Sequence, residues 1–284
     1  MPRVTPAALP RGSVITADVT RALAEDLGNG DLTANLLPPG TLLEARVVCR
    51  ESAVFCGRAW FQETFDQLDT GLELRWLVED GDLLVPNQRI CLIEGSARPL
   101  LSGERTALNF IQTLSGTATA TRAFVRALGD CPARLLDTRK TLPGLRLAQK
   151  YAVRCGGGHN HRIGLFDAIL LKENHIAAAG GITAAVTAAR AHAADVLLEV
   201  EVESLAELEE ACEAGAERAL LDNFSLEDLR TAVASFGGRL ELEASGDVTL
   251  ETVRSVGETG VDFISTGAIT KHLRAVDYSL RFED

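Results

Sequence analysis

The residues of this chain that are best placed to do chemistry lie in the stretch 139–172. It contains seven basic residues and one acid, Asp167, whereas the whole chain of 284 residues has a formal charge of −12. Three consecutive glycines, 156–158, and the histidines His159 and His161 lie within it. A dense positive charge in an acidic chain favours capture of a multiply charged anion, and glycines let the backbone approach a ligand closely. The stretch therefore predicts an anion-binding site, and the histidines are more in keeping with hydrogen bonding to an anion than with zinc binding, since no cysteine has metal-like spacing.

Carboxylates that could complement this block follow later in the chain. Glu199, Glu201 and Glu203 alternate with apolar residues, and Glu241 and Glu243 repeat the pattern. Side chains alternate between the two faces of a strand, so each set shares one face. The face is either an exposed edge or, if helices cover the apolar side, the mouth of a barrel. In the second case the carboxylates need cations or a metal, because an unpaired buried charge is costly.

The elements that must position these side chains alternate regularly from residue 133 onward. Short apolar runs alternate with helix-length amphipathic segments, and two segments begin with cap-like pairs, Ser204 with Glu207 and Ser225 with Asp228. The runs are Ala133–Leu136, Ala168–Leu171, Val196–Val202, Ala219–Leu221, Leu240–Ala244 and Val261–Ile264. Such units predict a parallel sheet, open or closed.

Each apolar run finishes in polar residues, and this favours the closed form. In an α/β barrel all carboxyl ends of the strands meet on one rim, whereas in an open sheet only those at a switch point converge. The ends are Asp137, Lys172, Glu201, Asp222, Ser245-Gly246 and Ser265-Thr266-Gly267. The last two are either ordinary turns or, after the final strands of a barrel, a phosphate site. Asp222 could cap the next helix, but Ser225 is better placed for that.

The first 115 residues have a different pattern. A helix-like start and a polar turn around Gly28, Gly30 and Asp31 precede strand-like runs, and a helical pattern covers 102–128. The runs are Leu42–Cys49, Ala53–Cys56, Leu72–Val78 and Ile90–Ile93. This part predicts a small α+β domain that ends in a long helix.

Composition restricts the class of protein. The chain is long enough for one barrel or two domains, and it has no apolar run long enough to predict a membrane span and no signal-peptide pattern. Six cysteines without metal-like spacing indicate reduced thiols and a cytoplasmic protein. A sequence pI near 5.0 argues against general nucleic-acid binding. We expect a small anionic substrate, and neither nucleic acid nor membrane as a partner.

Taken together, these residues resemble the quinolinate phosphoribosyltransferase family, the decarboxylating nicotinate-nucleotide pyrophosphorylases of NAD biosynthesis. The resemblance runs in order through most of the chain, over 25–33, 104–109, 115–119, 137–146, 150–165, 172–175, 199–203, 221–224, 243–246 and 262–271. It implies an N-terminal α+β open-faced sandwich domain, residues 1–115, followed by an incomplete, seven-stranded α/β barrel, residues 116–272. The tail, about 273–284, would pack back on the first domain.

The resemblance also implies the reaction. Quinolinate and 5-phosphoribosyl-1-pyrophosphate would give nicotinate mononucleotide, pyrophosphate and CO₂ with Mg²⁺ as cofactor, in a homodimer or larger assembly whose subunits share active sites. Quinolinate would be bound by Arg105 (from a neighbouring subunit), Arg139, Lys140, His161, Arg162 and Lys172. The phosphoribosyl donor would be bound by Lys140, Glu201, Asp222, Ser245, Gly246, Ser265 and Gly267. Glu201 and Asp222 would hold the metal, directly or through water, and with Lys140 would be the catalytic residues.

Two other functions stay open at this point. The first is a related phosphoribosyltransferase for a monocarboxylate such as nicotinate, or one that serves molybdate-linked metabolism; a monocarboxylate would need fewer cations than Arg105, Arg139, Arg162 and Lys172. The second is a catalytically silent barrel that binds a phosphorylated ligand. One residue departs from many family members, since Asp247 stands where a second glycine often follows Ser245-Gly246.

Overall fold

In the computed structural model, residues 8–282 are described, and they divide into two compact units that interleave along the chain. The first unit comprises 8–122, 142–157 and 272–282, and the second comprises 123–141 and 158–271. The sequence-based ranges, 1–115 and 116–272, divide the chain in order instead. No helix in the described part of the chain has the length and apolar character needed to cross a bilayer.

The first unit is built on an antiparallel sheet with the strand order β12-β1-β5-β3. Its strands are β1 (Leu42–Cys49), β3 (Glu73–Trp76), β5 (Gln88–Ser96) and β12 (Tyr278–Phe282), and β2 (Ala53–Val54) pairs separately with β4 (Leu83–Leu84). Its helices are α1 (Gly12–Leu27), the 3-10 turn η1 (Ala34–Leu36), α2 (Arg58–Leu68), α4 (Arg146–Gly156) and α3 (Ala97–Leu128), which belongs to this unit up to Arg122.

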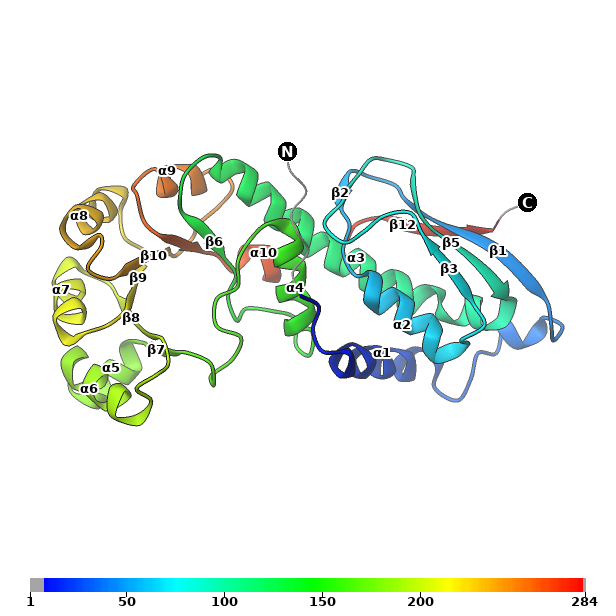
Figure 1. The fold of residues 1–284 in the computed structure, drawn as a ribbon, viewed down its shortest axis with the longest axis horizontal. Helices are drawn as coiled ribbons and strands as arrows, with labels where there is room; N and C mark the ends of the chain where they lie inside the picture. The colour runs from blue at the N-terminus through cyan, green and yellow to red at the C-terminus, as the bar shows by residue number, and fades with distance from the viewer. Residues whose placement is uncertain (1–7, 283–284) are drawn as a thin grey trace. The chain divides into compact units, whose positions relative to one another are not determined.

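Helices α2 and α3 cover one face of this sheet, as Figure 1 shows. The core between them is aromatic and aliphatic, and includes Phe61, Phe65, Ile93, Leu108 and Ile111, all at most 2% exposed. Burial of such side chains is the main stabilising contribution to the unit. The expected α+β open-faced sandwich is confirmed.

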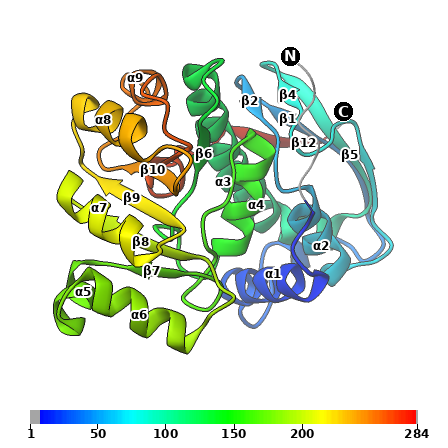
Figure 2. The same cartoon turned by 60° about the vertical axis from the view of Figure 1, so that its left-hand side comes forward.

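The second unit is a parallel sheet with helices along one side of it (Figure 2). Its strands are β6 (Arg134–Leu136), β7 (Ile169–Leu171), β8 (Leu198–Val202), β9 (Arg218–Asp222), β10 (Glu241–Ser245) and β11 (Phe263–Ser265). Its helices are α5 (Glu173–Ala179), α6 (Ile182–His192), α7 (Leu205–Ala214), α8 (Leu226–Phe236), α9 (Val253–Gly257) and α10 (Ala268–Lys271). Ser204 and Ser225 cap α7 and α8 by accepting the backbone N–H of Glu207 and Asp228, as the sequence predicted.

The strand order of this sheet is β6-β11-β10-β9-β8-β7, so the first strand lies beside the last one, as in a barrel. The α/β barrel is thus confirmed, but the sheet has six strands in the described residues rather than seven. The place next to β6 is taken by one residue, His159, which forms an isolated parallel bridge with Leu136. Its N–H donates to Leu135 O at 2.8 Å, and its carbonyl accepts from Asp137 N at 3.1 Å. The segment before His159 is the end of a helix, since α4 finishes at Gly156 and Gly157 is its C-cap, so no longer strand forms there.

Candidate active site

The polar strand ends of the second unit gather around one pocket of about 490 Å³. Nine of the site residues expected from the sequence line it, namely Arg139, Lys140, His161, Arg162, Lys172, Glu201, Asp222, Ser245 and Ser265. Thr138, Leu170, Leu220 and Glu243 complete the lining. Side chains that are spread over more than 120 positions of the sequence thus meet at the carboxyl ends of the strands, where α/β barrels place their chemistry.

The basic side of the pocket contains two neighbouring arginines. Burial lowers the pKa of Arg162, and the positive charge of Arg139 lowers it further. The guanidinium of Arg162 is held by a hydrogen bond from Nη1 to the carbonyl of Ala168, at 3.2 Å. Two guanidinium groups that repel each other at rest gain most when a doubly charged anion binds between them. Paired carboxylates also match the geometry of guanidinium groups.

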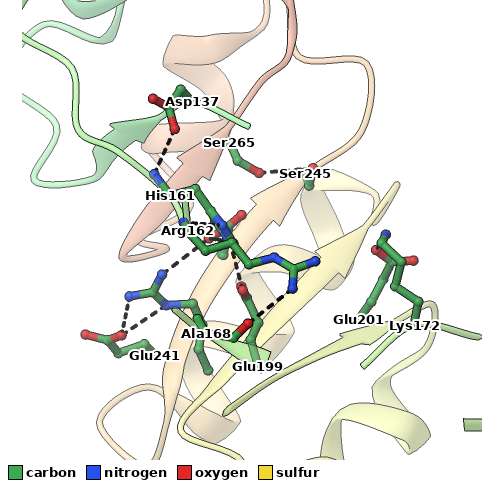
Figure 3. A network of polar contacts seen from close by, with 12 residues as sticks. Asp137, His161, Arg162, Ala168, Lys172, Glu199, Glu201, Glu241, Ser245 and Ser265 are labelled. Atoms are coloured by element: carbon green, nitrogen blue, oxygen red, sulfur yellow. Dashed lines mark hydrogen bonds and ion pairs between the residues drawn. The ribbon is translucent and has the colours of Figure 1, made fainter. Parts of the chain in front are cut away.

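The acidic side is formed by Glu201 and Asp222 on the neighbouring strands β8 and β9. Lys172 Nζ pairs with Glu201 Oε2 and so joins the basic side to the acidic one (Figure 3). Burial raises the pKa of Asp222, and the charge of Glu201 raises it further. These two carboxylates therefore repel each other, and a divalent cation between or near them would relieve the repulsion.

Magnesium fits this pair of carboxylates. Oxygen is its preferred ligand atom, and it usually binds through one or two carboxylates together with substrate phosphates. Asp222 does not cap helix α8, because Ser225 does, and the Oδ2 atom of Asp222 accepts a hydrogen bond from Asn223 Nδ2 at 3.0 Å. The magnesium ion itself stays a prediction.

The loops after β10 and β11 contain the residues for which the sequence predicts phosphate binding. Ser265 Oγ donates to Ser245 Oγ at 3.1 Å, so the two hydroxyls lie together (Figure 3). Gly246 has φ 98°, and a side chain there would overlap the amide of Asn223, whose Cγ is 2.7 Å from the position of an added Cβ. Asp247 also has a left-handed backbone, with φ 40°. Aspartate tolerates this conformation better than most residues, so it can stand where the family resemblance led us to expect a glycine.

Lys140 lies beside the second of these loops. Its carbonyl accepts a hydrogen bond from Thr270 Oγ1 at 2.8 Å, and its N–H donates to Thr138 Oγ1 at 3.0 Å. An added Cβ on Gly267 would be 2.9 Å from Lys140 Cδ. The glycine therefore makes room for the lysine side chain next to Ser265.

Three expected residues are not among those that line the pocket: Gly246 and Gly267, in the two loops described above, and Arg105. Arg105 lies on helix α3 in the first unit and is exposed. Its place in a neighbouring subunit's site stays a prediction.

The polar turn at Asp31 is structural: Asp31 Oδ1 accepts from the N–H groups of Thr33 and Ala34, and Oδ2 accepts from Ser102 Oγ.

A largely buried charged layer that the sequence did not predict as such is formed by His161 and Glu243, which line the pocket, together with Glu199 and Arg218, which do not. His161 Nε2 is 2.8 Å from Glu199 Oε2 and 3.5 Å from Glu243 Oε2, and Arg218 Nη1 is 3.6 Å from Glu243 Oε2. Glu199 and Glu243 are at most 1% exposed. Burial raises the pKa of Glu199 to about 7 and that of Glu243 to about 8. The alternating glutamates predicted that carboxylates would gather on one face of the strands. No feature of the sequence predicted that Arg218 would be their partner.

The architecture and the pocket together match an α/β-barrel phosphoribosyltransferase, with arginines and lysines beside carboxylates and two serine hydroxyls in one pocket. Comparison with known proteins gives the family. The model of the quinolinate phosphoribosyl transferase N-terminal domain matches residues 31–115, and that of the C-terminal domain matches residues 117–281. The chain belongs to the quinolinate phosphoribosyltransferase family and is a pentosyltransferase.

Individual relatives are similar over nearly their whole length. The chain is 43% identical to a probable nicotinate-nucleotide pyrophosphorylase [carboxylating] of Bacillus subtilis, over 90% of this chain and 89% of that protein. It is 41% identical to the chloroplastic nicotinate-nucleotide pyrophosphorylase [carboxylating] of Arabidopsis thaliana, over 95% and 83%. The solved structure of the nicotinate-nucleotide pyrophosphorylase from Francisella tularensis is 48% identical, with a TM-score of 0.94 over 97% of this chain and 98% of that one.

Proposed function

We propose that the chain transfers the phosphoribosyl group of 5-phosphoribosyl-1-pyrophosphate to quinolinate, with loss of CO₂, to give nicotinate mononucleotide in NAD biosynthesis. The observation that carries this proposal is that Arg139 and Arg162, which lie close enough for the charge of one to lower the pKa of the other, line the same pocket as carboxylates and serine hydroxyls. A pyridine dicarboxylate offers two adjacent anionic groups to the arginines. Leu170 and Leu220 supply an apolar surface for its ring.

The transfer step needs a ribosyl carbon with developing positive charge. As the pyridine nitrogen forms its bond to C1′, the bond from C1′ to the pyrophosphate oxygen breaks, and both electrons leave with pyrophosphate. The carboxylates of Glu201 and Asp222 face the pocket and stabilise positive charge at C1′ electrostatically. Lys140 lies at the side of the phosphate loops and can bind the leaving group. When bound, Mg²⁺ neutralises charge on the departing pyrophosphate.

Decarboxylation follows from the product of the first step. The nitrogen of the ring now carries a positive charge, and it stabilises the electron pair that remains on C2 when CO₂ leaves. A proton then takes the place of the carboxylate. The protein contributes here mainly by holding the substrate in position. The two arginines and Lys172 hold the carboxylates, and Ser245 and Ser265 lie where the 5-phosphate would bind.

The test is an assay of the purified chain with quinolinate, the phosphoribosyl donor and Mg²⁺, in which nicotinate mononucleotide and CO₂ are measured. We expect Arg139→Ala and Arg162→Ala to raise the quinolinate KM by roughly 100-fold, since each removes a charge-assisted pair. Arg230→Ala is the matched control, because Arg230 is exposed on α8. Turnover of nicotinate but not quinolinate would point to the monocarboxylate enzyme, and no product with either acid would point to the silent barrel.

The assembly and the compartment belong to the same proposal. We expect a homodimer or larger assembly in which Arg105 of one subunit completes the quinolinate subsite of the next. Mixing inactive Arg105→Ala and Glu201→Gln proteins should then restore activity through hybrid dimers that contain one intact site. The six cysteines are all free thiols, and this accords with a reducing cytoplasm.

A further inference from the structure

The buried layer contains a histidine, His161, whose two ring nitrogens both have partners in the protein. His161 Nδ1 accepts a hydrogen bond from the backbone N–H of Arg162 at 2.8 Å. On the other side of the ring, Nε2 is 2.8 Å from Glu199 Oε2. The backbone N–H of His161 itself donates to Asp137 Oδ1 at 2.9 Å. Ring and backbone are thus fixed from three directions.

This arrangement determines where the ring proton lies. A nitrogen that accepts a hydrogen bond cannot carry a proton in the ring plane, so Nδ1 is unprotonated. The proton of the neutral imidazole is therefore on Nε2, and Nε2 donates it to Glu199. With Nε2 directed to a carboxylate and Nδ1 to the backbone, the ring has no nitrogen directed at a ligand in the pocket.

The residue that benefits is the next one along the chain. The hydrogen bond to Nδ1 fixes the main chain of Arg162, and Arg162 also has to resist the repulsion of Arg139. The negative charge of Glu199 acts on Arg162 in the opposite sense to that of Arg139. Glu199 thus opposes the displacement of the arginine both through the imidazole and through its charge.

We propose that Glu199 is a positioning residue for the quinolinate subsite, which acts through the Nε2–H tautomer of His161 to fix the main chain and guanidinium of Arg162. His161 then acts on the subsite by holding Arg162 in position. The kinetic consequences of this inference rest on the proposed function. The position of the ring proton does not depend on that function.

The same side chains could suggest a metal site, since ligand atoms of His161, Glu199 and Glu243 lie within 4.8 Å of one another. The hydrogen bond to Nδ1 argues against it. A histidine that binds a metal through Nε2 keeps its proton on Nδ1, and Nδ1 here faces an N–H donor. Arg218, 3.6 Å from Glu243, already supplies a positive charge to this layer.

The kinetic test compares two variants of Glu199 with a control. We expect Glu199→Ala to raise the quinolinate KM by about tenfold or more, which corresponds to the loss of one buried hydrogen-bond partner. The kcat and the KM of the phosphoribosyl donor should change by less than about threefold. Glu199→Gln keeps an oxygen that accepts from Nε2 and should restore most of the affinity. Glu241→Gln is the control, because Glu241 also contacts Arg218 but is half exposed.

An equal rise of both KM values, or no change in either, would overturn the proposal, because a positioning role predicts a selective effect. The tautomer is tested separately, by nitrogen NMR of histidine-labelled protein without substrates. The wild-type spectrum should show His161 protonated at Nε2 and not at Nδ1, and this holds even if Glu199→Ala fails to fold. Protonation at Nδ1 would contradict the proposed tautomer. So would a metal ion that co-purifies with the wild type in an amount equal to the protein and is lost in Glu243→Gln. Absence of quinolinate turnover by a wild type with the expected tautomer would sink the proposed function alone.

Discussion

Lys172 and Glu201 form an ion pair at the carboxyl ends of the neighbouring strands β7 and β8. The side chain of Lys172 is 45% exposed and that of Glu201 is 16% exposed, so the pair lies at the pocket surface. In the protein without ligands each group thus neutralises the other. In the proposed reaction they have different partners, since Lys172 binds a substrate carboxylate and Glu201 faces the ribosyl carbon.

Glu201→Gln therefore should separate binding from catalysis. Lys172 loses its partner and becomes fully available to the dicarboxylate, so the quinolinate Kd should stay the same or fall. The kcat should fall by about 100-fold, because the negative charge that stabilises the transition state is gone. Calorimetry with quinolinate and steady-state kinetics measure the two effects. Quinolinate binding that is weakened more than tenfold would contradict this division of roles.

Asp222 and Ser225 lie three residues apart, and substitutions at the two positions should have opposite effects on stability and on kcat. Ser225 caps α8, so Ser225→Ala should lower the free energy of unfolding by about 1 kcal/mol and leave kcat unchanged. Asp222→Asn should lower kcat by at least about tenfold without loss of stability. Chemical denaturation and the product assay are carried out on both. If Asp222→Asn were the less stable variant, the carboxylate would have a structural role instead.

Gly246 should be essential for binding of the phosphoribosyl donor. Gly246→Ala adds strain at φ 98° and a collision with Asn223, and a displaced phosphate loop should lower kcat/KM by roughly 100-fold. Gly180→Ala is the matched control. Gly180 has a similar left-handed φ of 91°, but an added Cβ there meets nothing within 4 Å. A similar loss in both variants would mean that backbone strain, rather than the phosphate loop, limits activity.

The buried layer should make stability depend on pH. The pKa of Glu243 is raised to about 8 in the folded protein, chiefly by burial, from an ordinary value of 4.5. The folded state thus favours the protonated carboxyl group, so the free energy of unfolding should fall as pH rises from 4.5 to about 8 and then level off. Glu243→Gln should make this part of the pH profile flatter, as thermal unfolding between pH 5 and pH 9 would show. An unchanged slope in the variant would exclude Glu243 as its source, and Glu241→Gln serves as the control.

Much of this fold can be predicted from the order of residues along the chain. The parallel sheet follows from the alternation of apolar runs and amphipathic helices, and the runs 42–49 and 133–136 lie at or within one residue of β1 and β6. The six apolar runs correspond to the six strands, whereas the seventh strand that the resemblance implied is not formed in the described residues, where His159 makes only a single bridge beside β6. A local pattern does not reveal whether a segment beside a sheet makes one bridge or several.

The residues around the pocket could be predicted for the same reason, because the carboxyl ends of parallel strands lie at the same edge of the sheet. The buried layer was not. The contacts of Arg218 with Glu241 and Glu243 depend on the register between β9 and β10, in which Arg218 is opposite Glu241. Register is a tertiary property. The two hydrogen bonds of the His161 ring likewise depend on a turn geometry that the residue types alone do not specify.

The bridge of His159 with Leu136 makes the spacing of the following residues critical. His159 is held in the hydrogen-bonding pattern of a strand, and only two residues later His161 has to reach Glu199 from the same backbone. An inserted or deleted residue between them would turn the ring to the opposite side and take Arg162 with it. A substitution of Asn160, the residue between the two histidines, alters its own contacts, such as the hydrogen bond from Nδ2 to Asp137 Oδ2, whereas a change in length by one residue would displace both His161 and Arg162. We therefore expect position 160 to tolerate a substitution better than a change in length.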